Sequence, residues 1–192
     1  IKFTSAKRWA TPIPLDKYRL VTGKDEYPSF LKKDIKDDTL QVYSNGELNY
    51  QLNGVNCRVS VIWNFMAAVG TEGTGDTHYS VVKGSKANIE IRQGAEQKYK
   101  PVLYVVNNGD DDAAFEATLR KALKSVGDKY PGLGIEKSGD KEWKVAIPAD
   151  IVKTHEQRFS SVMQVYLGYL VDGQIPAWER SQMISKYYTT TK

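Results

Sequence analysis

The sequence contains few of the residues on which common functional sites depend. Its 192 residues include one cysteine and two histidines. An intrachain disulfide is therefore excluded, and a zinc site built on paired histidines is not expected. The phosphate-binding motifs GxGxxG and GxxxxGK[ST] do not occur, and neither does the GxSxG turn of hydrolases. We therefore expect no catalytic, cofactor or metal residues in this chain.

Long apolar runs and a strong charge of one sign are also missing. No run approaches the ~20 apolar residues that a membrane-spanning helix needs, so no membrane association is expected. The 27 basic and 23 acidic side chains leave a net charge of +4, and no basic stripe interleaves with aromatics, which argues against nucleic acid as a partner. The chain begins with Ile1 and lacks the features of a signal peptide. We expect a piece of a longer protein, in the cytoplasm or the periplasm.

What the sequence does contain is a series of segments typical of antiparallel strands. Apolar residues alternate with polar ones over 40–52 and 55–65, and the Asn-Gly pairs at 45–46 and 53–54 predict tight hairpin turns. The same alternation assigns Trp63 to the core. Further strands are expected at 77–83, 86–92 and 101–106, and a short hairpin is expected around 138–140.

Helical signals come mainly in the second half. Apolar spacing predicts a helix over 115–126, with the acidic run Asp110–Asp112 explained by capping better than by a metal. Thr154 and Gln157 form a capping box that opens a second helix, and 177–188 is amphipathic. Only a short helix, 15–22, is predicted in the first 35 residues. The pattern predicts an α+β fold: one domain over 1–192, a large, mostly antiparallel, open-faced sheet with helices packed on one face.

The candidate ligand-facing residues are polar side chains near strand or helix ends. The richest segment is 75–93, which contributes His78, Lys83 and Arg92, and the capped helix adds His155 and Arg158. We take these five as candidate substrate-binding residues. A structural role is the competing interpretation, since histidines are often satisfied on polar sheet faces. The four tryptophans and twelve tyrosines make a carbohydrate a reasonable ligand, because aromatic rings stack on sugars.

Eight short segments of the chain occur in an order shared with a known family. They are VYSNGE (42–47), VSVIWNF (59–65), GDTH (75–78), KGSKA (83–87), IRQG (91–94), HE (155–156), PAWE (176–179) and KYY (186–188). In these segments the sequence resembles the putative oxidoreductase C-terminal domain family, whose members follow a Rossmann domain in a branch of the Gfo/Idh/MocA dehydrogenases. The resemblance spans nearly the whole chain.

The resemblance implies a substrate-side and oligomerisation domain of an oxidoreductase. The oxidoreductase would act on sugars, polyols or their derivatives and would use NAD(P) as its cofactor. The main partner of this domain would be its own N-terminal Rossmann domain, which is absent from this chain. A homo-oligomer would form through the open sheet face. The family's Asp-x-x-x-His motif has no match, since Asp76 and His78 have the wrong spacing, so no catalytic role passes to His78. Members often have a second histidine where Arg158 stands. The alternatives are a non-enzymatic carbohydrate-binding module and a dimerisation scaffold.

Overall fold

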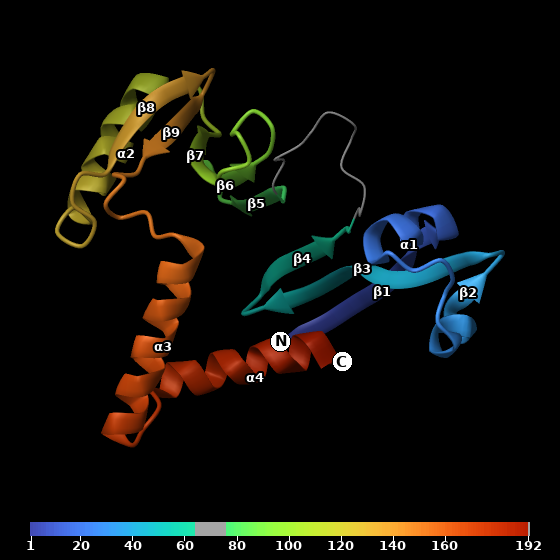
Figure 1. Cartoon of the computed structure of the whole chain (residues 1–192). Coiled ribbons are helices and arrows are strands. Elements are labelled where there is room, and N and C mark those ends of the chain that lie inside the picture. The colour runs from blue at the N-terminus through green and yellow to red at the C-terminus, as the bar shows by residue number, and fades with distance from the viewer. Residues whose placement is uncertain (64–75, 192) are drawn as a thin grey trace. The chain divides into compact units, whose positions relative to one another are not determined.

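The computed structural model describes residues 1–63 and 76–191. The chain forms two compact units, Ile1–Ala67 together with Gln174–Lys192, and Ala68–Gly173. We call them the first unit and the second unit, and each is described by itself (Figure 1). No helix in the described residues is long and apolar enough to cross a membrane.

The first unit is built on a four-stranded sheet in which β3 is the central strand. β1 pairs with one side of β3, and β2 and β4 also pair with it, all antiparallel. Its elements are β1 (Lys2–Pro14), α1 (Leu15–Thr22), a 3-10 helix (Ser29–Asp34), β2 (Ile35–Lys36), β3 (Thr39–Leu52), β4 (Val55–Val61) and α4 (Ala177–Thr191). The predicted helices 15–22 and 177–188 are thus confirmed, while β1 was not predicted.

Two Asn-Gly pairs in the first unit adopt different structures. Asn53 and Gly54 adopt φ angles of 49° and 81° and join β3 to β4, as predicted, because this pair tolerates the left-handed backbone of a tight turn. The turn predicted at Asn45-Gly46 is wrong, since β3 runs straight through it. The side chain of Asn45 is buried and donates to the Trp9 carbonyl (3.2 Å) and to Thr11 Oγ1 (2.9 Å).

Asn45 instead belongs to an irregularity of the sheet. The register between β1 and β3 shifts between Trp9 and Thr11, which leaves backbone groups outside the regular ladder. Besides its two donated bonds, the Asn45 side chain accepts a hydrogen bond from the Trp63 amide at 2.7 Å. One side chain therefore connects β1, β3 and the segment that follows β4.

The β3–β4 hairpin has two chemically distinct faces. On one face the register pairs apolar residues, Leu48 with Val59, Tyr50 with Cys57 and Leu52 with Val55. The other face pairs Glu47 with Ser60, Asn49 with Arg58 and Gln51 with Asn56. The alternation predicted over 55–65 is confirmed for 55–61, and residues 64–65 lie outside the described residues. Burial differs from the prediction, because Val55, Val59 and Trp63 are exposed.

The second unit contains a five-stranded antiparallel sheet in the order β5-β6-β7-β9-β8. Its elements are β5 (His78–Lys83), β6 (Ala87–Gln93), β7 (Val102–Asn107), α2 (Asp112–Ser125), β8 (Gly134–Gly139), β9 (Glu142–Ala146) and α3 (His155–Asp172). The predicted strands, both hairpins and both helices of this half are confirmed. Asp111 caps α2 by accepting from the Ala114 amide at 2.9 Å.

The core of the second unit lies between α2 and one face of its sheet. Trp143 is fully buried there, beside Val105 and Val145, and Phe115 of α2 packs against its ring with centroids 5.2 Å apart. The indole Nε1 of Trp143 donates to Glu116 Oε2 at 3.0 Å. The opposite sheet face is open. The α+β class with open, antiparallel sheets is therefore confirmed, with the strands divided between two sheets.

Candidate functional site

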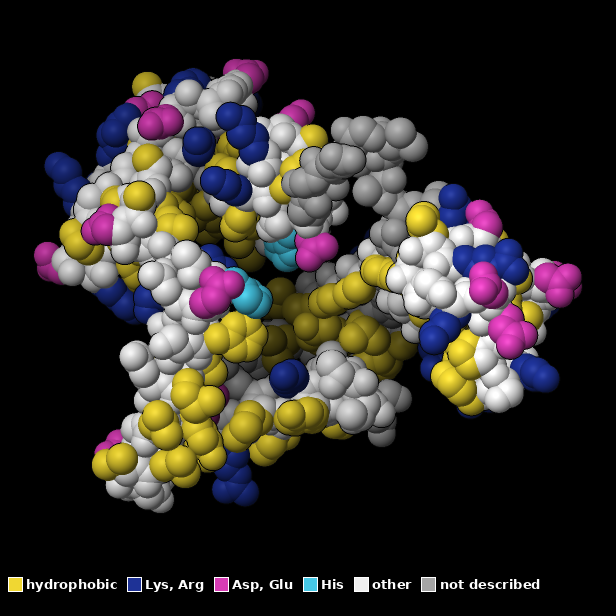
Figure 2. All heavy atoms as spheres, in the orientation of Figure 1, with side chains coloured by type: hydrophobic (Ala, Val, Ile, Leu, Met, Phe, Trp, Pro, Cys, Tyr) yellow, Lys and Arg dark blue, Asp and Glu magenta, His cyan; other side chains and the backbone are white. Residues whose placement is uncertain are grey.

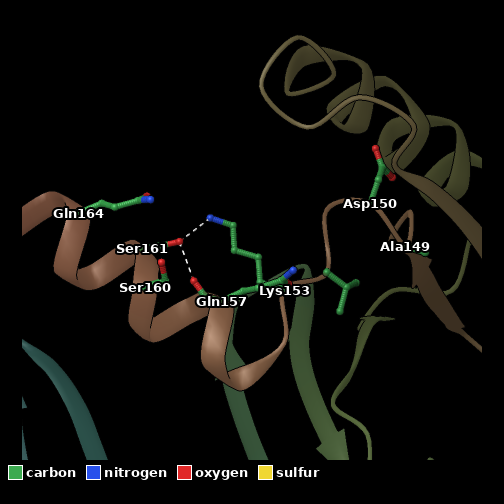
Figure 3. Close-up of a pocket in the computed structure, with 8 residues that line it drawn as sticks. Ala149, Asp150, Lys153, Gln157, Ser160, Ser161 and Gln164 are labelled. Atoms are coloured by element: carbon green, nitrogen blue, oxygen red, sulfur yellow. Dashed lines mark hydrogen bonds between the residues drawn. The ribbon is translucent and has the colours of Figure 1, made fainter.

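Helix α3 and the segment before it form a shallow groove of about 490 Å³ (Figure 3). Four of the lining residues follow one another on α3 at spacings of three, one and three, which places them on a single side of the helix. The lining consists of Ala149, Asp150, Val152, Lys153, Gln157, Ser160, Ser161 and Gln164. Hydroxyl and amide groups thus dominate this side of α3, and the preceding segment adds the charged Asp150 and Lys153.

Local hydrogen bonds fix the N-terminal end of α3, which borders the groove. The predicted capping box is confirmed: Thr154 Oγ1 accepts from the Gln157 amide (3.3 Å), and Gln157 Oε1 accepts from the Thr154 amide (2.9 Å). Lys153 Nζ donates to Ser161 Oγ at 2.8 Å, and that hydroxyl donates to the Gln157 carbonyl at 2.9 Å. The groove therefore presents an oriented ammonium and neutral polar groups, which suit an oxygen-rich ligand.

The opposite side of α3 is apolar and exposed. We call it the apolar stripe, and each of its members is at least 50% exposed: Phe159, Val162, Met163, Tyr166, Leu167 and Leu170. His155 lies on this side, with its ring 4.8 Å from that of Phe159 in an edge-on contact. Arg158 follows Gln157 by one residue, about 100° around the helix, and flanks the groove. Neither His155 nor Arg158, the two predicted residues on α3, lines the groove.

The other three predicted residues lie on the β5–β6 hairpin. His78 pairs with Gln93, and Tyr79 pairs with Arg92. Since paired residues share a sheet face and neighbours alternate, His78 and Arg92 lie at the same end of the hairpin on opposite faces. Lys83 lies at the other end, on the face of Arg92. The hairpin thus separates these three side chains.

Arg92 is already engaged by carboxylates. Its Nη2 lies 2.8 Å from Glu90 Oε2 and 2.7 Å from Glu142 Oε2, and its guanidinium is 4.5 Å from the centroid of the Tyr104 ring. Burial acts to lower the pKa of Arg92, but the hydrogen bonds to both glutamates prevail and raise it above the ordinary value. The charge of Arg92 is therefore balanced within the open sheet face.

The acidic run at the start of α2 has structural partners. Asp110 pairs with Lys141 (2.8 Å) and Asp112 with Lys137 (2.7 Å), and these lysine hydrogen bonds are the main reason that the pKa of each aspartate lies below its ordinary value. Within residues 1–63 and 76–191 no group of three or more acidic, histidine or cysteine side chains could hold a metal ion.

The five predicted residues therefore fall on two separate elements, the β5–β6 hairpin and the first turn of α3. The groove residues Lys153, Gln157, Ser160, Ser161 and Gln164 were not predicted. A signal existed, because polar residues at 157, 160, 161 and 164 repeat at helical spacing opposite the apolar stripe.

Comparison with known proteins extends these observations. The chain matches the family described as the putative oxidoreductase C-terminal domain over residues 1–192. The chain belongs to this family. Its fold is similar to that of a putative oxidoreductase from Parabacteroides merdae ATCC 43184, with 47% sequence identity and a TM-score of 0.90. A comparison with curated proteins gave no match.

The similarity covers 99% of this chain and 43% of the Parabacteroides merdae protein. The C-terminal domain described here thus spans less than half the length of that relative. The sequence resemblance to the family is confirmed.

Proposed function

We propose that this chain is the substrate-side and oligomerisation domain of an NAD(P)-dependent oxidoreductase that acts on a sugar or polyol derivative. The observation that carries the proposal is the match to an oxidoreductase C-terminal domain over the whole chain, combined with the absence of a dinucleotide fingerprint from the sequence. The dinucleotide and the hydride-transfer chemistry then belong to an N-terminal Rossmann domain outside this chain.

A hydroxylated substrate is supported by the chemistry of α3. The groove exposes hydroxyls and amides from Ser160, Gln157 and Gln164, which both donate and accept hydrogen bonds. Adjacent hydroxyl groups of a sugar or polyol need such mixed partners. His155 and Arg158, at the start of the same helix, remain our candidates for contacts to the substrate.

An oligomerisation role is supported by the open face of the second unit's sheet. The face carries exposed Tyr79 and the Arg92–Tyr104 pair. Tyrosine and arginine are enriched at protein interfaces and in their energetic hot spots. A homo-oligomer through this face would bury side chains that are already ordered, so little conformational entropy would be lost.

A calorimetric titration tests whether dinucleotide binding belongs to the Rossmann domain and not to this chain. This chain alone should show no binding of NAD⁺ or NADP⁺, whereas a polypeptide that includes the Rossmann domain should bind one of them and reduce or oxidise a sugar or polyol. Tight dinucleotide binding by the isolated chain would contradict the proposal. Glycan binding by the isolated chain, without any oxidoreductase activity of the longer polypeptide, would favour a carbohydrate-binding module instead.

A further inference from the structure

The chain contains three Asn-Gly pairs, at 45–46, 53–54 and 108–109. This dipeptide is prone to spontaneous loss of the asparagine side-chain amide, because glycine has no side chain to keep its amide nitrogen away from the preceding carboxamide. The sequence alone therefore predicts similar behaviour for all three pairs. The structure distinguishes them by their hydrogen bonds, all of which lie within one unit or the other.

The reaction is an internal displacement followed by hydrolysis. The glycine amide nitrogen loses its proton and attacks Cγ of the asparagine, so that a new N–C bond forms and ammonia leaves. Water then adds to one of the two carbonyls of the five-membered imide, and the bond between that carbonyl and the ring nitrogen breaks. The product is aspartate or isoaspartate, and the only co-reactant is water. A carboxamide or glycine amide that is held by hydrogen bonds must first be released before it can react.

Asn45 is held by the sheet of the first unit. Its buried carboxamide makes three hydrogen bonds, two to β1 and one to the segment that follows β4. Gly46 lies inside β3 and is paired with β1 on one side and β4 on the other. The carboxamide can turn toward the Gly46 amide only when these strands separate, so a reaction at Asn45 requires local unfolding.

Asn108 is exposed, yet both reacting groups of its pair are engaged. Its Nδ2 donates to the Gly84 carbonyl at 2.9 Å and to Asn88 Oδ1 at 3.2 Å. The Gly109 amide, which would be the nucleophile, donates to Asn107 Oδ1 at 2.9 Å. Asn108 therefore separates the effect of exposure from the effect of hydrogen bonding.

The Asn53-Gly54 pair has neither form of protection. The two residues make the exposed turn between β3 and β4, with φ angles of 49° and 81°. Among the described residues, no hydrogen bond holds the Asn53 carboxamide or the Gly54 amide. Nothing lies within 4 Å of the position that a Cβ of Gly54 would take, so the approach to this turn is open.

We propose that Asn53 is a deamidation site of the folded protein and that the fold protects Asn45 and Asn108. The proposal is independent of the proposed function, because it uses only contacts inside each unit. It makes the tip of the β3–β4 hairpin the position at which this protein changes covalently with age.

The two products should affect the hairpin differently. Asp-Gly suits the same tight turn as Asn-Gly, so aspartate keeps the pairing of Leu52 with Val55 beside the turn. Isoaspartate adds a methylene to the main chain, and a two-residue turn of that length no longer matches the register of its strands. Figure 2 shows hydrophobic side chains over the hairpin that this turn closes. The isoaspartate form should therefore loosen the pairing of an apolar strand end.

Peptide mass spectrometry tests the proposal on purified protein that contains residues 1–192. The protein is incubated in mildly alkaline buffer, and deamidation of the three pairs is followed in the same samples. Each hydrogen bond that must break slows the attack severalfold, so Asn53 should react at least about tenfold faster than Asn45 or Asn108. In guanidinium chloride the three rates should converge, because the hydrogen bonds are lost.

Three outcomes would overturn the proposal. The first is equal rates at the three pairs in the folded protein. The second is an intact Asn53 under conditions in which a synthetic peptide of residues 49–58 deamidates. The third is a rate order that persists in guanidinium chloride, since the neighbouring sequence and not the fold would then set the rates.

Two variants test the site and its consequence. Asn53→Gly keeps a residue suited to the turn and removes the carboxamide, so the incubated variant should keep the hydrogen exchange of a fresh sample in peptides from 48–60. Incubated wild type should exchange faster there, in proportion to its isoaspartate content. Freshly purified Asn53→Asp carries the charge without the longer main chain and should exchange like fresh wild type. Equally accelerated exchange in incubated Asn53→Gly would show that the change begins elsewhere and would contradict the assignment.

Discussion

The side chain of Asn45 should contribute more to the stability of the first unit than any other single polar group described in it. Asn45→Ala removes two donated hydrogen bonds, to the Trp9 carbonyl and to Thr11 Oγ1, and one accepted from the Trp63 amide. A typical hydrogen bond contributes about 0.5–1.5 kcal/mol net, and a buried group that loses its partner costs about 1–3 kcal/mol.

The expected total is moderated by the neighbours of Asn45. Thr11 Oγ1 also lies 3.0 Å from the Trp63 carbonyl and 3.3 Å from Ser44 Oγ, so its hydroxyl keeps other partners after the substitution. The expected loss in the free energy of unfolding is therefore about 2–3 kcal/mol. Asn45→Asp should destabilise at least as much at neutral pH, since a carboxylate can accept from the Trp63 amide but cannot donate to the other two groups.

Guanidinium denaturation would measure the loss in the free energy of unfolding. Hydrogen exchange of peptides from 39–52 would show whether that loss occurs in the first unit. Exchange in β7 should be unchanged, because Asn45 belongs to the other unit. Asn56→Ala is the matched control: it removes one exposed hydrogen bond, from Gln51, and should cost less than about 0.5 kcal/mol. The reasoning is refuted if Asn45→Ala and Asn56→Ala have equal effects.

Three further outcomes follow from the described geometry. Gly54→Ala should destabilise the β3–β4 hairpin by about 1–2 kcal/mol in denaturant titrations, since φ is +81° with nothing within 4 Å of an added Cβ, so only backbone strain acts. Thr154→Ala should lower helix stability by about 1 kcal/mol, with a loss of ellipticity at 222 nm on warming, whereas Ser160→Ala should not. The pKa of Glu116 is lowered by its hydrogen bond from Trp143 and then by Arg120. The ionised Glu116 carboxylate therefore stabilises the fold fully above the ordinary glutamate pKa. This stabilisation is lost as the pH falls through the lower pKa of Glu116 in the folded protein. Thermal midpoints from pH 7 down to pH 3 should therefore fall less steeply in Glu116→Gln, and parallel curves would count against this account.

The sequence predicted those elements whose signals are local. The capping box at Thr154, the turn at Asn53-Gly54 and the period-two alternation of β4 each depend on residues within a few positions of one another, and all three are confirmed. The turn at Asn45-Gly46 failed because the same dipeptide is used for contacts to Trp9 and Thr11, more than thirty residues away. Propensity gives way where tertiary hydrogen bonds favour another backbone.

The candidate site was harder to predict for a related reason. Polar residues on α3 read as a solvated helix face, and only the packing of the 149–153 segment turns that face into a groove. The charges of Arg92 and its two glutamates are conspicuous in the sequence, but their mutual engagement depends on the pairing of β6, β7 and β9. The substrate-binding roles of the five predicted residues stay predictions.

Strand β1 has a consequence for how this chain behaves before it meets any partner. It is thirteen residues long and pairs only with β3 among the described strands, so its outer side is an open template for strand addition by a second molecule. Pro12 lacks an amide hydrogen, and two register shifts interrupt the regular pairing of the strand. Such features discourage edge-to-edge aggregation, so a freshly synthesised chain can expose a long strand without polymerising through it.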